Sequence, residues 1–142
     1  MRSSFYILIL LSAFCIILSC SKGGSTLQED PIHEITLQDT IFPVIEINKP
    51  LNNQVFVSGE SILVEGKVTD ISLYRGKIRI VDDANNSVIK EQLYEIHGFA
   101  SYDFNLTLKT SVLSAATYTV SVEFEDHGLN VTTRTVKVKV NL

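Results

Sequence analysis

Tryptophan is absent from this chain of 142 residues, and cysteine, proline and methionine are scarce, with two, three and one copies. There is no excess of positive charge, because 12 Lys and Arg residues stand against 16 Asp and Glu residues. The formal net charge of −4 provides no basic stripe for a phosphate backbone, so the sequence predicts no nucleic-acid partner. A chain of this length forms about one domain, and it is too short for a two-domain dinucleotide-binding enzyme or an eightfold βα barrel.

Catalytic motifs are lacking as well. The sequence contains no Gly-x-Ser-x-Gly, His-Glu-x-x-His or phosphate-binding-loop pattern. Its three histidines, His33, His97 and His127, are expected in a linker and in two separate turns, without a shared strand. Enzymes need a nucleophile–base pair or a poised acid–base pair, and no motif here supplies one. We therefore expect no enzymatic activity, no catalytic residue and no cofactor.

The one long hydrophobic run lies at the N-terminus, from Phe5 to Leu18, and it follows the positive charge of Arg2. A transmembrane helix needs about 20 apolar residues, so this run is short for one. Its length and its flanking residues are typical of a secretory signal peptide. We therefore predict that residues 1–19 are a signal peptide.

The end of this segment, Ile17-Leu18-Ser19-Cys20, resembles the lipobox of bacterial lipoproteins. The resemblance implies cleavage before Cys20 and lipidation of its thiol. Cys15 leaves with the signal peptide, so the mature chain has no cysteine pair for a disulfide. Ser21, where an Asp would suggest retention in the inner membrane, favours the outer membrane and leaves undetermined which face, periplasmic or surface-exposed, carries the protein. The alternative is a plain signal anchor in which Cys20 has no role.

Residues 20–40 are predicted to be the lipidated N-terminus and a flexible linker. Gly, Ser, Thr, Gln and charged residues are frequent there, and no hydrophobic period is sustained. Within this segment, Asp39-Thr40-Ile41 resembles the short motif at which Bacteroidetes-type secreted proteins are O-glycosylated. Thr40 is therefore a candidate glycosylation site, on a motif short enough to arise by chance.

Apolar and polar residues alternate through most of the remaining chain. The alternation is clearest in residues 62–68, 74–80, 102–108, 118–124 and 136–140. Period two is typical of strands with one buried and one wet face, and Val122 and Phe124 fall on the predicted buried face. Turn residues recur between these runs, and no segment has the apolar stripe of a helix. Residues 41–142 are therefore predicted to form an all-β antiparallel sandwich of seven to eight strands.

This domain, residues 41–142, is similar to bacterial immunoglobulin-like and fibronectin-III-like modules. The resemblance rests on residues 49–56 (KPLNNQVF), 116–122 (ATYTVSV) and 126–130 (DHGLN). It implies an immunoglobulin-like antiparallel β-sandwich without the antibody-type core, because the chain has no Trp and no cysteine pair. The whole layout resembles uncharacterised single-domain lipoproteins of the Bacteroidetes.

Such modules share an architecture but not a function, so the resemblance names no ligand. The sequence predicts a lipid-anchored, non-catalytic binding or spacer module at the outer membrane. Its expected partners are the membrane, through the N-terminal lipid, and an envelope protein or a glycan. The alternative is an accessory carbohydrate-binding lipoprotein of a glycan-uptake system. Tyr94 and Phe99 are the candidate ligand-contacting residues, whereas Tyr102 shares the parity of the core.

Three acidic residues, Asp39, Asp70 and Asp126, are expected at one end of such a sandwich. Ca²⁺ takes about 6–8 oxygen ligands, and three Asp residues fall short of that set. Asp is also common in turns because its side chain bonds the local backbone. We therefore predict no metal-binding residue, and Ca²⁺ binding at the end that carries Asp70 and Asp126 stays open.

Overall fold

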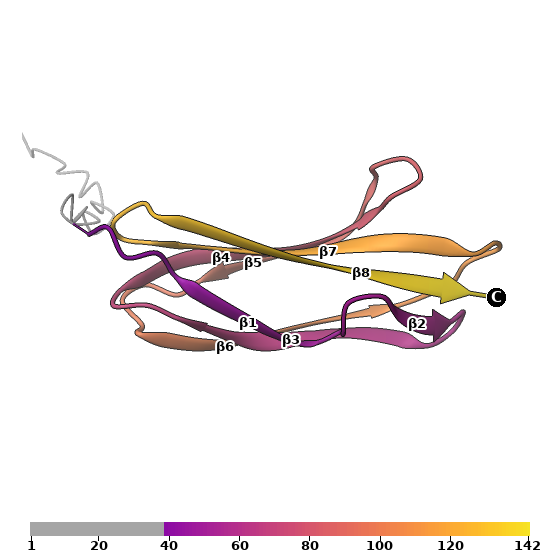
Figure 1. The fold of residues 1–142 in the computed structure, drawn as a ribbon, viewed down its shortest axis with the longest axis horizontal. Coiled ribbons are helices and arrows are strands. Elements are labelled where there is room, and N and C mark those ends of the chain that lie inside the picture. Colours follow the sequence, from indigo (N-terminus) through magenta and orange to yellow (C-terminus); the bar gives the residue numbers. More distant parts are fainter. Residues whose placement is uncertain (1–38) are drawn as a thin grey trace, which may run out of the picture. The chain divides into compact units, whose positions relative to one another are not determined.

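The computed structural model describes residues 39–142, which form eight β-strands and no helix (Figure 1). The strands are β1 (Val44–Lys49), β2 (Gln54–Val57), β3 (Ser61–Thr69), β4 (Leu73–Asp82), β5 (Val88–Glu95), β6 (Ser101–Lys109), β7 (Ala116–Asp126) and β8 (Val131–Asn141). The predicted signal peptide, Cys20 and the predicted linker up to residue 38 lie outside the described residues. Within the described part of the chain, no helix has the length and hydrophobicity to cross a membrane.

Two sheets pack face to face, with strand orders β1-β3-β6 and β2-β8-β7-β4-β5 (Figure 1). Neighbouring strands are antiparallel except β2 and β8, which run parallel. The parallel pair arises because the chain leaves the three-stranded sheet after β1 and, beyond residues 50–53, joins the five-stranded sheet next to its last strand. The predicted immunoglobulin-like sandwich of seven to eight strands is confirmed, and this parallel pair is its departure from an all-antiparallel arrangement.

The core consists of the residues that point inward from the two sheets, as the alternation predicts. Val122 and Phe124 of β7 are fully buried, which confirms the predicted face of this strand. The ring of Phe124 meets the ring of Phe104 from β6, with centroids 5.5 Å apart. These two rings therefore join the sheets across the centre of the sandwich.

Each ring of this pair lies over a glycine on the neighbouring strand. Phe104 is opposite Gly66 of β3, and Phe124 is opposite Gly76 of β4. A Cβ atom added to either glycine would overlap the phenyl ring beside it. The missing side chains therefore make the space that the two rings occupy.

The sandwich has two ends that carry different turns (Figure 1). We call the end where the described chain begins the entry end, and it also carries the turns of residues 70–72, 96–100 and 127–130. The opposite end, called the far end, carries residues 83–87 and 110–115. The main-chain N–H of Asp70 donates to the carbonyl of Ala100 at 3.0 Å, and Asn130 Nδ2 donates to the carbonyl of Asp39 at 3.1 Å. Hydrogen bonds thus connect the separate segments of the entry end.

Side chains of β5 close the gap between the edges of the two sheets. Lys90 Nζ donates to the carbonyl of Thr107 at 2.6 Å, and the hydroxyl of Tyr94 donates to the carbonyl of Asn105. Both acceptors belong to β6, the edge strand of the three-stranded sheet. The outward-pointing carbonyls at the middle of β6 are therefore occupied from within the same molecule.

Candidate functional site

The entry end holds a cluster of three carboxylates from Asp39, Asp70 and Asp126. One carboxylate oxygen of each lies within 4.8 Å of the other two. Asp39 precedes β1, Asp70 follows β3 and Asp126 ends β7, so three distant parts of the chain converge here. The expectation that these residues share one end of the sandwich is confirmed.

Asp126 is fully buried, and the β7–β8 turn satisfies its carboxylate. The main-chain N–H of Asn130 donates to Oδ1 at 2.8 Å, and Asn130 Nδ2 donates to Oδ2 at 2.9 Å. A Cβ at position 128 would lie 2.8 Å from the Cβ of Asp39, so Gly128 permits the close approach of the entering chain. Sequence reasoning assigned no role to Asn130, although it belongs to the family-like DHGLN segment.

Asp70 is the member of the cluster whose charge is least compensated. Its Oδ1 accepts a hydrogen bond from the main-chain N–H of Ser72 at 2.9 Å. Its Oδ2 is buried and has no hydrogen-bond partner among residues 39–142. Burial raises the pKa of Asp70, the Ser72 N–H opposes that rise, and the charges of Asp126 and Asp39 raise it further. The cluster therefore favours a proton or another cation at Asp70.

These three residues are the group within the described chain whose side chains could share a metal ion. Ca²⁺ takes about 6–8 oxygen ligands, so three carboxylates supply part of its ligand set. The carbonyls of Asp39 and Ile41 lie nearby, but both accept hydrogen bonds from Asn130 Nδ2. What the geometry establishes is a local concentration of negative charge with one uncompensated oxygen.

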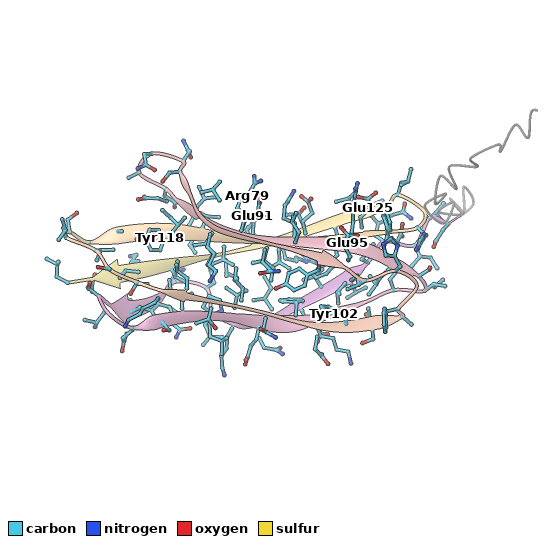
Figure 2. All side chains as sticks on the ribbon, turned by 180° about the vertical axis from the view of Figure 1, so that it is seen from behind. Arg79, Glu91, Glu95, Tyr102, Tyr118 and Glu125 are labelled. Atoms are coloured by element: carbon cyan, nitrogen blue, oxygen red, sulfur yellow. The ribbon has the colours of Figure 1, made fainter. Side chains whose placement is uncertain are left out.

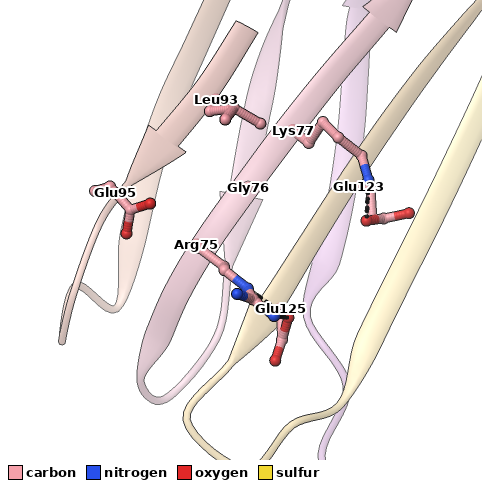
Figure 3. Close-up of a pocket in the computed structure, with 7 residues that line it drawn as sticks. All are labelled: Arg75, Gly76, Lys77, Leu93, Glu95, Glu123 and Glu125. Carbon is pink, nitrogen blue, oxygen red and sulfur yellow. Dashed lines mark hydrogen bonds and ion pairs between the residues drawn. The ribbon is translucent and has the colours of Figure 1, made fainter. Parts of the chain in front are cut away.

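A second candidate site is a shallow pocket on the outer face of the five-stranded sheet, with a volume of about 250 Å³ (Figure 3). Its lining comes from three strands, β4, β5 and β7, and consists of Arg75, Gly76, Lys77, Leu93, Glu95, Glu123 and Glu125. Figure 2 shows Glu125, together with Arg79 and Glu91 farther along, on the side of this sheet that faces away from the three-stranded sheet.

Residues of opposite charge form contact pairs within the lining of this pocket. Arg75 Nε donates to Glu125 Oε2 at 2.7 Å, and Lys77 Nζ lies 2.9 Å from Glu123 Oε1. Both pairs join residues that are directly opposite in the β4–β7 register. Leu93 of β5 is 60% exposed and adds one apolar contact surface. The pocket therefore presents paired charges beside one apolar side chain, and sequence reasoning missed it by treating these outward positions only as a wet face.

The two candidate ligand-contacting residues occupy different environments. Tyr94 is half-buried, with its ring centroid 5.8 Å from that of Tyr102 and 6.1 Å from that of Phe124. Burial raises the pKa of its hydroxyl. Tyr94 is therefore part of the packing between the sheets rather than an exposed platform. Phe99 lies in the β5–β6 turn and is exposed, so ligand contact by this residue stays a prediction.

Two histidines that the sequence placed in separate turns come together at the entry end. The rings of His97 and His127 lie 4.9 and 5.1 Å from the ring of Tyr74, between centroids. His97 Nε2 is also 3.3 Å from Glu95 Oε2. The strand order causes this meeting, because β4 runs between β5 and β7 and brings Tyr74 to both turns.

The remaining predicted sites concern covalent modification. Thr40 is exposed next to Asp39, and its glycosylation stays a prediction. Cys20 lies outside the described residues, so its lipidation also stays a prediction.

No protein-family model and no curated protein matches the chain. Among solved structures, it is similar to an engineered protein from the Northeast Structural Genomics Consortium, with a TM-score of 0.51 and 16% sequence identity. That match covers 70% of this chain and 20% of the other, so the chain spans a fifth of that protein's length. At this identity the likeness concerns the fold alone.

Two further solved structures match at lower TM-scores. The fibronectin(III)-like modules of CbhA from Clostridium thermocellum match with a TM-score of 0.44 and 17% identity, over 71% of this chain and 47% of the other. A CARDB domain from Pyrococcus furiosus, solved in complex with di-metal ions, matches with a TM-score of 0.39 and 15% identity, over 72% of this chain and 96% of the other.

Proposed function

We propose that this chain is a lipid-anchored, non-catalytic immunoglobulin-like module that acts as a binding or spacer domain at the outer membrane. The observation that carries the proposal is the sequence Ile17-Leu18-Ser19-Cys20 at the end of a signal-peptide-like segment. The sandwich that follows supports it, because such a domain presents sheet faces and turns for contact without a dedicated catalytic centre. The membrane is the first partner, and an envelope protein or a glycan is the second.

The anchor is tested by replacing Cys20 with Ser in the full chain and expressing it in a bacterium with an outer membrane. We expect C20S to lose labelling by radioactive fatty acid, because Cys20 is the one thiol left after cleavage. The domain should then be released from the membrane fraction or remain as an uncleaved precursor. The matched variant C15S should be labelled and processed normally. Acylated and processed C20S would contradict the proposal.

The charged lining of the outer-face pocket suits a polar partner, which could be an envelope protein or a glycan. One experiment distinguishes the two. The unacylated mature chain is applied to a glycan array and, in parallel, used to capture envelope proteins. We expect protein capture to weaken when Lys77 and Leu93 are both replaced by Ser, since both line the pocket. The exposed Lys67 and the half-buried Leu63, on the outer face of the other sheet, provide the control when both are replaced by Ser. Glycan binding that the K77S/L93S change removes would instead favour the carbohydrate-binding alternative.

A further inference from the structure

The entry end exposes a group of large apolar side chains that we call the apolar rim: Ile41, Phe42, Ile71, Phe99 and Leu129. Each of them is between 51% and 64% exposed. They come from the start of the described chain and from the β3–β4, β5–β6 and β7–β8 turns. Contiguous exposed apolar surface marks a site of interaction with a protein or a membrane.

The rim is one surface rather than five isolated residues. Ile41, Phe42 and Ile71 line a common hollow of about 300 Å³, together with Ala100 beside Phe99. The main-chain N–H of Leu73 donates to the carbonyl of Phe99 at 2.9 Å, which ties the β5–β6 turn to β4.

The β7–β8 turn is tied to the same surface. Asn130, the residue after Leu129, donates from Nδ2 to the carbonyl of Ile41 at 3.2 Å. The main-chain N–H of His127 donates to the carbonyl of Ser72, next to Ile71, at 3.0 Å. Hydrogen bonds therefore connect the four segments that carry the apolar side chains.

The covalent path of the chain indicates which surface this rim meets. Residues 20–38 join Cys20 to the entry end, and a chain of that length spans at most about 65 Å. The far end also exposes apolar side chains, such as Leu113 at 99%, but the lipid-bearing segment does not enter there. A tether of this length raises the effective concentration of the rim at the lipid surface to about the millimolar range, so a weak contact becomes populated.

We propose that the apolar rim is a membrane-contact surface, through which the sandwich stands on the lipid bilayer with its entry end inserted at the interface. This inference rests on the proposed lipid anchor at Cys20. The apolar face of an interfacial amphipathic helix is buried about 5–10 Å into the boundary between headgroups and acyl chains, and the rim offers the same kind of apolar surface on turns. The carboxylates of Asp39, Asp70 and Asp126 at the same end disfavour anionic lipid, so the surface fits zwitterionic headgroups.

The absence of tryptophan makes the test direct, because a single introduced Trp is the sole source of indole emission. The mature chain is coupled through Cys20 to a maleimide lipid in phosphatidylcholine vesicles whose acyl chains are brominated. F99W places the probe on the rim, and L113W places it in an exposed turn at the far end. We expect a blue shift and at least twofold quenching for F99W, and neither effect for L113W. Equal quenching of the two probes, or none for F99W, would overturn the inference.

A second pair of variants separates lipid contact from a change in the fold. Replacing Phe42 and Ile71 by Ser in the F99W chain should remove the quenching while leaving the far-ultraviolet circular dichroism unchanged. Replacing the exposed Leu113 and Leu142 of the far end by Ser should leave the quenching intact. Quenching that survives the F42S/I71S change would overturn the proposed contact. An F99W shift that requires an added envelope protein would also overturn it in favour of protein docking.

Chemical coupling keeps this test independent of acylation in the cell. Unquenched F99W on coupled vesicles overturns the membrane contact and leaves the anchor proposal standing. The anchor proposal is tested by a separate experiment, and fatty-acid labelling that persists in C20S would contradict it.

Discussion

Two neighbouring aspartates at the entry end show how hydrogen-bond partners decide what a buried charge costs. Asp126 is fully buried, and both of its oxygens accept hydrogen bonds from Asn130. Asp70 is less buried, but its Oδ2 has no donor within the described part of the chain. A buried acceptor without a donor costs about 1–3 kcal/mol, so Asp70 opposes folding more than its burial alone would suggest.

Replacing Asp70 by Asn tests this account. The folded-state pKa of Asp70 is raised above 3.8, so ionisation of this group opposes folding. That opposition is fully present above the folded-state pKa and disappears as the pH falls below 3.8. We expect D70N to raise the melting temperature by about 2–5 °C at pH 7, and the gain to shrink towards pH 3.5.

Thermal melts from pH 3.5 to pH 8 measure the effect. D103N, on the exposed face of β6, provides the control and should change stability by less than about 0.5 kcal/mol. A lower melting temperature for D70N at pH 7 would show that the carboxylate stabilises the entry end.

The strands that meet at the centre depend on a repeated arrangement of phenylalanine over glycine. Phe104 of β6 covers Gly66 of β3, and Phe124 of β7 covers Gly76 of β4. Because the two rings also contact each other, a change in one is transmitted to both sheets. Interiors are close-packed, so neighbouring strands cannot fill a space left here without moving.

Removing the ring of Phe124 should therefore be costly. We expect F124A to lower the free energy of unfolding by about 3–5 kcal/mol, since it removes a fully buried ring and leaves a cavity. Urea unfolding measures the change, and L93A, at a position that is 60% exposed, should stay within about 0.5 kcal/mol. A loss below about 1 kcal/mol for F124A would contradict the inward orientation of β7.

Strand positions could be predicted where apolar residues on one face of the strand alternate regularly with polar residues on the other. In β7 the inward Val122 and Phe124 alternate with polar residues, because one face is buried along its whole length. In β8, Arg134 shares the parity of the buried residues of this strand but is itself exposed. The strand β2 pairs only with residues 138–141 of β8. The first half of β8 is therefore an edge, where polar residues on both parities are tolerated. No local sequence pattern predicts which strand lies at the edge of a sheet. Nor does any predict that β2 pairs in parallel with β8.

The arrangement of the whole molecule explains which residues of the candidate sites could be predicted from the sequence. The alternating strand pattern could place Asp70 and Asp126 in turns, and the resemblance to immunoglobulin-like modules implied that these turns share one end. The pocket that Arg75 and Glu125 help to line could not be predicted, since it depends on β4 and β7 lying side by side in register. The packed position of Tyr94 could not be predicted either. It arises because β5 and β6 are the edge strands of the two sheets and face each other.

Occupation of the β6 carbonyls has a consequence for crowding. An edge strand with unpaired carbonyls invites edge-to-edge aggregation with another copy. The proposed lipid anchor would confine copies to a thin layer and so increase how often such edges meet. Lys90 and Tyr94 already fill the acceptors of Thr107 and Asn105. Two acceptors of this edge are therefore already taken by side chains of the same molecule and are not free to pair with a strand of another copy.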